Sequence, residues 1–366
     1  FWIIGLASLG WAVMKGVSKG IEAWAKVMMP AIYVFGIILA IRAVTLGAPV
    51  NPDWSSMKGL NYVWNPDLSQ LTSSSVVTAT GQIFFTLSLG MGIICNYASY
   101  LQPDEDIVTA SVATVALNEF AEVILAGTSV IPISYAFLGP EGIKGSIGLA
   151  FMALPNVFTT MAGGRIFGAV WFFLLFFAGF TSAIAMYNYL VALLEEELGV
   201  ERKKGAIVIF ILYLIVGAPI AAEGIITGEA NLVYFTEVDN WIGNYLLIVL
   251  GLLEVITLAW LVKDEGLEEM NRGGLWHVPK WFYRVFHQFL TPICIIVFLA
   301  IFTKDYWTAG NFKITPSYIE GIEYMAPWVT AARLVVVVVL IIGFAQTYRA
   351  IKRKYKDEIE SNKVNA

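Results

Sequence analysis

The sequence predicts an all-α integral membrane protein, and three observations lead to this fold class. The chain has 366 residues, of which 58% are hydrophobic and only 14% are charged, whereas soluble domains typically carry about 25% charged residues. The apolar residues form long unbroken runs, which argue against the alternating strands of about ten residues that build a membrane β-barrel. An unusually apolar soluble protein is the alternative, but its core could not bury this excess.

Nine segments are candidate membrane spans, since about 20 mostly apolar residues cross the hydrocarbon of a bilayer. In chain order they are residues 1–14, which is short, 21–46, 76–100, 105–138, 165–194, 205–224, 239–262, 285–303 and 327–350. The loops between them, such as 49–75 and 263–284, are rich in proline, glycine and charged residues.

Lysine and arginine orient these spans, because cytoplasmic loops are enriched in basic residues. With the C-terminal tail inside, the inner segments carry 16 of the 23 basic residues, and the opposite orientation breaks the rule. We therefore expect a multi-pass protein of the cell's inner (plasma) membrane with a cytoplasmic C-terminus. Nine spans then place residue 1 outside. Because the chain opens on the hydrophobic run FWIIGLASLGW without an initiator methionine, we expect that its N-terminal part is missing.

Several classes of site have no support in the sequence. Cys95 and Cys294 lie inside apolar segments, so they suggest neither a disulfide framework nor a zinc site. No glycine-rich phosphate loop follows a strand, and no basic patch alternates with aromatic residues, so nucleotides and nucleic acids are not expected ligands. The net charge of −5 is small and says little about partners.

The span at 76–100 carries an interruption, since residues 84–96 read FFTLSLGMGIICN. Gly90 and Gly92 each weaken a helix by about 1 kcal/mol relative to alanine. Unwound backbone is tolerated at membrane depth only where it is buried in protein or lines a watery cavity, and transporters use such breaks to bind ions and substrates. Close helix packing through small residues is the alternative explanation.

Polar groups in two other spans favour an ion pathway. Asn118 and Glu122 are four residues apart and share a helix face, with Glu119 nearby, and intramembrane carboxylates are usually functional. A structural hydrogen bond or a protonated glutamate would be the simpler explanation.

A second group occurs at Ala178, Thr181 and Ser182, where one carbonyl and two hydroxyls offer hard oxygen ligands that suit Na⁺. These hydroxyls could instead bond back to their own helix. Asp239 precedes Trp241 at the outer mouth of a span, where it is either functional or a helix cap.

The residues as a set resemble the bacterial branch of the neurotransmitter:sodium symporters, from residue 1 to about 352. The similarity is carried by the contiguous motifs GQIFFTLSLGMG, NYASY, LNEFAEVILAG, WFFLLFFAGFTSAIAM, EEEL and EEMNRGG. The resemblance implies a leucine-transporter-like bundle of two inverted repeats, each of five helices, with the first and sixth helices unwound at the midplane. Segment 76–100 resembles the sixth helix, and helices one to three are missing.

The resemblance also implies a division of the chain. Residues 1–46 would end the first repeat with helices four and five, 47–75 would be an extracellular loop, 76–262 the second repeat with helices six to ten, 263–350 helices eleven and twelve with their connecting loops, and 351–366 a cytoplasmic tail.

Site residues follow from the same resemblance. The positions that match substrate contacts are Phe85, Thr86, Ser88, Met91, Ser182 and Met186. The first sodium site is matched by Thr86 and Asn118, and the second by Ala178, Thr181 and Ser182. Asp239 matches the acidic half of an outer gate and Glu196 that of an inner gate, whereas Gln82 resembles a residue near the outer gate and Phe85 an aromatic beneath it.

The resemblance implies a Na⁺-coupled importer of hydrophobic amino acids rather than an enzyme, with Na⁺ as the coupling ion and with an amino acid and the bilayer as partners. The oligomeric state is left open. A carrier of the same fold for another small amine is the closest alternative. An intramembrane hydrolase using Glu119 and Glu122 and an ion channel are remote ones, and a channel would carry current without saturable uptake.

Two residues refine this expectation. Chloride-dependent relatives hold Cl⁻ close to the first sodium site, where this chain carries Glu122. A carboxylate there would repel a second anion, so chloride dependence is not expected. Met91 stands where a leucine-selective relative has phenylalanine. Because methionine is adaptable, bulky and aromatic substrates such as tryptophan are expected, although Met91 could be simple packing.

Overall fold

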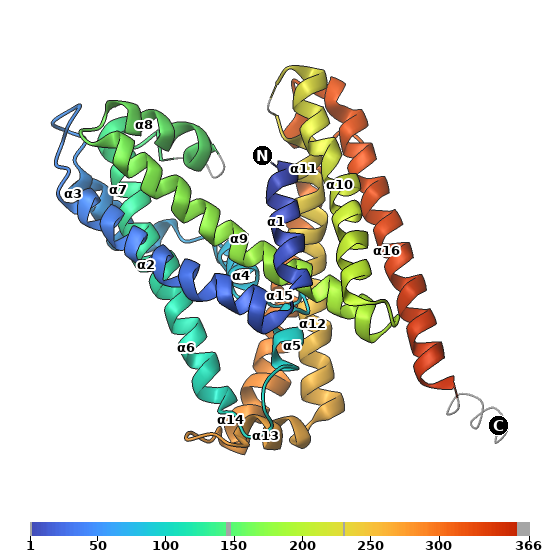
Figure 1. Ribbon diagram of the computed structural model, residues 1–366. Helices are drawn as coiled ribbons and strands as arrows, with labels where there is room; N and C mark the ends of the chain where they lie inside the picture. Colours follow the sequence, from blue (N-terminus) through green and yellow to red (C-terminus); the bar gives the residue numbers. More distant parts are fainter. Residues whose placement is uncertain (1, 144–147, 230, 357–366) are drawn as a thin grey trace. The chain divides into compact units, whose positions relative to one another are not determined.

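The computed structural model describes residues 2–143, 148–229 and 231–356. These described residues form helices and turns and contain no strand, which confirms the predicted all-α class. The α-helices are α1 (Trp2–Met14), α2 (Glu22–Val44), α3 (Ser56–Trp64), α4 (Ser73–Thr86), α5 (Ile93–Ala98), α6 (Ile107–Glu119), α7 (Gly127–Leu138), α8 (Leu154–Thr160), α9 (Gly164–Glu196), α10 (Arg202–Thr227), α11 (Val233–Val238), α12 (Leu247–Ile256), α13 (Asp264–Asn271), α14 (Lys280–Tyr283), α15 (Thr291–Thr308) and α16 (Ala326–Lys354) (Figure 1).

Shorter turns of other helix types extend or connect several of these helices. The π-helical turns are η1 (Val17–Ile21), η3 (Phe120–Ala126), η4 (Leu149–Ala153), η5 (Asp239–Leu246), η6 (Thr257–Val262) and η7 (Arg284–Leu290). The 3₁₀ turns are η2 (Leu68–Gln70), η8 (Ser317–Ile319) and η9 (Glu323–Met325).

Seven helical stretches among the described residues are long and apolar enough to cross a membrane. They are Val17–Val44, Ile107–Leu138, Gly164–Glu196, Arg202–Thr227, Val233–Val262, Lys280–Thr308 and Glu323–Lys354. Each overlaps one of the nine predicted spans. The remaining two predicted spans correspond to the short α1, with 13 residues, and to the interrupted pair α4 and α5.

Several regions outside the predicted spans prove to be helical, among them α3, α8, α13 and the last turn of α16. The loop predicted at 47–75 contains α3, whose N-terminus is capped because the Ser55 hydroxyl accepts the N–H of Lys58 at 3.2 Å. At the other end of the chain, α16 continues one turn beyond the predicted limit of 350. Its last turn carries Lys352, Arg353 and Lys354, and cations stabilise the C-terminal end of a helix dipole.

The described chain divides into two compact units. One contains α1, α4, α5, the C-terminal end of α9 and the helices that follow it. The other contains the segments Lys15–Leu71 and Thr109–Ala185.

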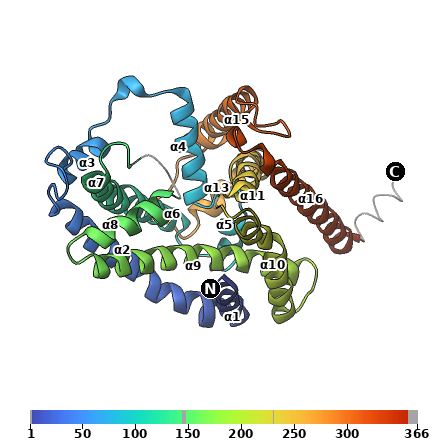
Figure 2. The ribbon, with the colours of Figure 1, turned by 90° about the horizontal axis from the view of Figure 1, so that it is seen from above.

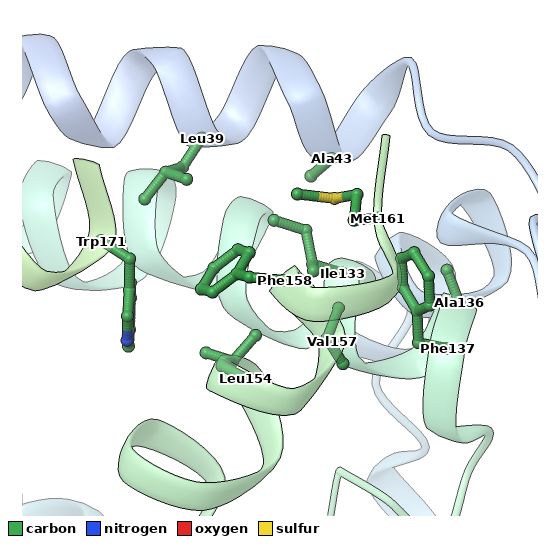
Figure 3. Packing of buried hydrophobic residues seen from close by; sticks show 10 residues of the cluster. All are labelled: Leu39, Ala43, Ile133, Ala136, Phe137, Leu154, Val157, Phe158, Met161 and Trp171. Carbon is green, nitrogen blue, oxygen red and sulfur yellow. The ribbon is translucent and has the colours of Figure 1, made fainter. Parts of the chain in front are cut away.

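The second unit has a core built from short apolar faces of several helices. Figure 3 shows this core, whose members are Leu39 and Ala43 of α2, Ile133, Ala136 and Phe137 of α7, Leu154, Val157 and Phe158 of α8, with Met161 and Trp171. The spacing of three or four residues within each helix places these side chains on one face. Helix α3 closes against α7 at Gly59, where a Cβ would lie 2.7 Å from Cα of Pro132. A larger residue would therefore separate these two helices.

The first unit packs the interrupted span against two other helices. Helix α4 packs against α12 and α15, of which α15 is seen beside α4 in Figure 2, and α11 packs against α16. At the latter contact, Val233 of α11 and Val329 of α16 are buried with Ile319 and Met325 from the preceding loop. This packing fixes the surroundings of the interruption, because α12 supplies the surface on which it lies.

Candidate functional site

The predicted interruption is present: α4 ends at Thr86 and α5 begins at Ile93. The hydrogen-bond ladder changes there in three steps. Leu87 donates to the carbonyl of Ile83 as in a regular helix, Ser88 donates to Phe85, and Leu89 donates to Phe84 at 2.9 Å. This last pattern is the wide bond of a Schellman helix end. The regular ladder resumes when Asn96 donates to Gly92 at 3.0 Å.

Three residues in the interruption adopt left-handed backbone angles. Ser88 has φ of 55°, Gly90 of 72° and Gly92 of 70°. Glycine takes such angles without steric cost, whereas a side chain there costs roughly 1–2 kcal/mol. Ser88 is therefore the strained residue of the turn, and strain of this kind is found where neighbouring structure determines the conformation.

The two glycines also lie in close contact with other helices. A Cβ at Gly90 would lie 2.5 Å from the carbonyl oxygen of Leu247 in α12, and one at Gly92 would lie 2.6 Å from the ring of Tyr189. On the opposite surface, a Cβ at Gly251 of α12 would meet the ring of Phe84 at 2.5 Å. The glycines therefore break the helix and also allow close packing, whereas a binding role for the break stays a prediction.

Glu254 of α12 was missed by the sequence analysis. Its Oε2 accepts a hydrogen bond from the backbone N–H of Gly90 at 3.1 Å. A signal was present in the sequence, because this glutamate stands alone in the apolar run GLLEVITLAW. Its partner could not be inferred, since Gly90 and Glu254 are 164 residues apart.

The substrate residues predicted on the interrupted span lie on its last helical turn and on the turn that follows. Phe85 is exposed, whereas Thr86, Ser88 and Met91 are half-buried. Gln82 is exposed one turn earlier on α4. The stretch thus presents an aromatic ring, two hydroxyls and a thioether beside backbone that has left the helix.

The predicted ion ligands on α9 lie on an uninterrupted helix. Ala178, Ser182 and Met186 are spaced by four residues and so follow one face of the helix. The hydroxyl of Thr181 donates to the carbonyls of Phe177 at 2.9 Å and of Ala178 at 3.1 Å. Thr181 therefore bonds back to its own helix, as the alternative explanation of this site expected. The hydroxyl oxygen still has lone pairs that point away from the donated proton. Ser182 is exposed.

Asn118 and Glu122 lie on either side of a change in helix type. Asn118 belongs to α6, which ends at Glu119, and Glu122 belongs to the π-helical turn η3. The wider turn alters the angular relation expected for an α-helix, and such π-bulges occur frequently at functional sites. The turn is held by packing, since Leu125 within it contacts α2 at Gly36, where a Cβ would lie 3.1 Å away.

The two compact units divide the predicted ligands. Thr86 belongs to one unit, and Asn118, Ala178, Thr181 and Ser182 belong to the other. The structure describes each group of ligands within its own unit. The two sodium sites therefore stay predictions. Among the described residues, no group of three or more His, Cys, Asp or Glu could hold a metal ion. The predicted ion ligands offer hydroxyl, amide and carbonyl oxygens.

The two predicted gate carboxylates are both exposed. Asp239 begins the π-helical turn η5, and its Oδ2 accepts a hydrogen bond from the side-chain amide of Asn244 at 3.3 Å. Glu196 ends α9. The carboxylates beside Glu196 are paired, because Glu195 binds Arg202 at 3.2 Å and Glu197 binds Lys354 at 3.2 Å.

A buried ion pair next to Asp239 was also missed. Glu237 is fully buried, and its Oε1 accepts hydrogen bonds from Arg333 Nε at 2.6 Å and Trp241 Nε1 at 2.8 Å. Its Oε2 accepts one from the hydroxyl of Tyr318. Burial raises the pKa of Tyr318 above its usual range, and the bond to the carboxylate raises that pKa further, because both favour the neutral phenol. The C-terminal end of α11 is thereby fixed to α16.

Comparison with known proteins identifies the family to which this chain belongs. The profile of the sodium:neurotransmitter symporter family matches residues 2–350. An uncharacterized sodium-dependent transporter of Methanocaldococcus jannaschii is 31% identical over 314 residues, which are 82% of this chain and 60% of that protein. The uncharacterized sodium-dependent transporter YhdH of Bacillus subtilis is 31% identical over 292 residues, which are 78% of this chain and 62% of that protein.

A solved structure gives the same assignment. The crystal structure of MhsT in complex with L-phenylalanine is similar to this fold with a TM-score of 0.68 and 30% sequence identity, covering 81% of this chain and 66% of MhsT. This likeness confirms the leucine-transporter-like class. The expectation of a transporter rather than an enzyme agrees with the family and with the names of the relatives. The chain spans about 60% of the length of the curated relatives that it matches, and it belongs to the sodium:neurotransmitter symporter family.

Proposed function

We propose that this protein is a Na⁺-coupled importer of bulky hydrophobic amino acids, and that the interruption between α4 and α5 forms part of its substrate site. One observation carries the proposal: three left-handed residues, Ser88, Gly90 and Gly92, turn the backbone out of the helix within a stretch of five residues. Such backbone at membrane depth needs polar partners, because hydrocarbon cannot satisfy its N–H and C=O groups. An amino acid with its charged amine and carboxylate is a suitable ligand.

Sodium would be held by neutral oxygen atoms. In the proposed first site Thr86 and Asn118 contribute a hydroxyl and an amide together with the substrate carboxylate. In the second, the carbonyl of Ala178 acts with Thr181 and Ser182. Hard oxygen ligands of this kind bind cations such as Na⁺ and give a soft metal no advantage. The shared carboxylate would make ion binding and substrate binding depend on each other.

The substrate side chain would contact Phe85, Met91 and Met186. Two of these are methionines, whose unbranched thioether chains adapt to guests of different shape. A lining that yields in this way discriminates weakly by size, since one methylene in an apolar pocket is worth about 1–3 kcal/mol. The relative MhsT was crystallised in complex with L-phenylalanine, and this supports an aromatic substrate here.

Transport would proceed by alternating access, with the interrupted span moving relative to a scaffold. Asp239 would act at the outer gate with Gln82 and Phe85 beneath it, and Glu196 would act at the inner gate. This assignment rests on the proposed orientation with a cytoplasmic C-terminus in the inner membrane. It also rests on the proposed repeat boundaries at 1–46 and 76–262.

Uptake of radiolabelled leucine into proteoliposomes tests the proposal. An inward Na⁺ gradient should drive saturable accumulation above equilibrium, and replacement of Na⁺ by choline should abolish it. Excess unlabelled tryptophan or phenylalanine should compete, whereas glycine and charged amino acids should not. Accumulation that is unaffected by removing Na⁺, or current without saturable uptake, would contradict the proposal.

A further inference from the structure

Glu254 is a carboxylate inside a membrane-spanning helix that no predicted site uses. It lies on α12, within the span Val233–Val262, and its side chain is half-buried. Ionisable groups at membrane depth are costly and rare unless they have a partner or a function. The question is therefore what this carboxylate does there.

Its partner is the backbone of the interrupted span. In a regular helix the N–H of Gly90 would donate to the carbonyl four residues earlier, that of Thr86. Instead it donates to Oε2 of Glu254 at 3.1 Å. The carboxylate thus takes the place of a helical carbonyl at the centre of the turn.

Packing on both sides holds this hydrogen bond in place. Before the turn, the ring of Phe84 rests on Gly251 of α12, and at the turn Gly90 rests on the backbone of Leu247 and Gly251. One face of α12 therefore makes three contacts with the interrupted segment. Gly251 packs against the ring of Phe84, the backbone at Leu247 and Gly251 packs against Gly90, and the carboxylate of Glu254 accepts the N–H of Gly90. These three contacts form one docking surface for the interrupted segment.

We propose that Glu254 is a positioning residue that anchors the interrupted segment to α12 and so holds the flanking residues Ser88 and Met91 in their binding geometry. The inference rests on the proposed function of that segment. Glu254 belongs to a different helix from the proposed substrate residues. It is not proposed to touch the substrate, and it acts through its hydrogen bond with Gly90. Two titratable side chains of the described residues, Cys95 of α5 and Tyr189 of α9, lie close enough to interact with it electrostatically.

Two substitutions distinguish the hydrogen bond that Glu254 accepts from the effect of its charge. Glu254→Gln removes the charge but keeps an oxygen that can accept from Gly90, and Glu254→Ala removes the acceptor. Because the N–H of Gly90 then loses its acceptor, Glu254→Ala should weaken substrate affinity by roughly tenfold or more. Glu254→Gln should lie between that variant and the wild type. Glu268→Gln is the matched control, because Glu268 is an exposed glutamate of α13.

The kinetic result distinguishes positioning from general damage. In Glu254→Ala the KM for leucine uptake should rise while the maximal rate, normalised to folded protein by gel filtration, changes less. If Glu254→Ala has the wild-type KM, or if only its maximal rate falls, the proposal is wrong. Should the alanine variant not fold, Glu254→Asp serves in its place. It keeps the charge but shortens the reach to Gly90, so it should raise the KM, and a wild-type KM would overturn the proposal.

A second readout does not depend on transport. In a Cys294→Ala background, Cys95 is the remaining cysteine, and it lies on α5 directly after the interruption. Because charge alone alters thiol reactivity, the comparison is between the two uncharged variants at Glu254. The maleimide reaction of Cys95 should be several times faster in Glu254→Ala than in Glu254→Gln. Equal rates would overturn the anchor even in a protein that transports normally, whereas absent uptake by the wild type would contradict the proposed function alone.

Discussion

The interrupted segment of residues 86–93 and the intact helix α9 supply predicted site residues in two different ways. In the first, the backbone itself changes direction at Ser88, Gly90 and Gly92. In the second, the helix runs from Gly164 to Glu196 without a break, and side chains spaced by three or four residues provide the polar groups. The interrupted segment would therefore bind through its backbone, and α9 would bind through side chains on one helix face.

The two regions are therefore vulnerable to different substitutions. The interrupted segment depends on the absence of side chains, because a Cβ at Gly90 would collide with α12. The face of α9 depends on the presence of particular oxygen atoms, and its backbone would survive their removal. Substitutions should damage the first region through structure and the second through ligand chemistry, and the following predictions test that contrast.

The largest effect is expected from Gly90→Ala. The new methyl group would lie 2.5 Å from the carbonyl oxygen of Leu247, and the left-handed angle would add roughly 1–3 kcal/mol of strain. Substrate binding should fall by well over tenfold in a scintillation proximity assay. Gly81→Ala on the same helix is the control, since a Cβ there meets nothing within 4 Å. Equal binding by both variants would show that the interruption tolerates side chains.

The next effect concerns the oxygen atoms of α9. Replacing Thr181 and Ser182 together by alanine should raise the Na⁺ concentration for half-maximal substrate binding several-fold and leave the amount of folded protein unchanged. Thr303→Ala on α15 is a matched control, because Thr303 also back-bonds to its own helix, donating to Leu299 at 2.7 Å. If the control shifts the Na⁺ dependence as much as the double variant does, Thr181 and Ser182 are structural.

The third prediction concerns chloride. Wild-type uptake should be the same in chloride and in gluconate, because the carboxylate of Glu122 would repel an anion near the first sodium site. Glu122→Ser should make uptake respond to chloride, with the lower rate in gluconate. Glu119→Ser removes a neighbouring carboxylate from the same span and should not create this response. Chloride dependence in the wild type would refute the assignment of Glu122.

The smallest effect is expected at Met91. Met91→Phe replaces a flexible side chain by a rigid one, so tryptophan should compete for labelled leucine uptake a few-fold less well, while leucine itself is little affected. The change is small because apolar pockets discriminate by only about 1–3 kcal/mol per methylene. Met152→Phe, at a position of η4 that is 62% exposed, should leave the competition profile as it was. An unchanged profile in Met91→Phe would assign Met91 to packing.

Local sequence signals predicted most of this fold. Long apolar runs placed the spans, and the pair Gly90 and Gly92 placed the interruption, because the free-energy cost of glycine in a helix acts locally. The left-handed angle at Ser88 had no such signal, since serine has no preference for it, and the angle follows from the Schellman ending and the contact with α12. Local periodicity also could not show the π-helical turn between Asn118 and Glu122.

Partners distant in the sequence were the part that could not be predicted. Glu254 and Glu237 are visible as carboxylates in apolar surroundings, but their partners Gly90 and Arg333 lie far away in the chain. The pairing of a buried carboxylate with a particular hydrogen-bond donor depends on how the helices pack. A single sequence encodes that packing only through the shapes of many side chains together. The proposed substrate residues on α4 were indicated by resemblance to a family, whereas the spacing of Ala178, Thr181 and Ser182 on α9 had already indicated an ion site.

In the proposed mechanism the interrupted segment and the face of α9 bind one amino acid and Na⁺ together. Calorimetry tests this by measuring the affinity for Na⁺ with and without saturating tryptophan, beside the affinity for tryptophan with and without saturating Na⁺. Coupling between two sites is reciprocal, so each ligand should tighten the other by the same factor, of tenfold or more. Na⁺ affinity that is independent of tryptophan would contradict joint binding.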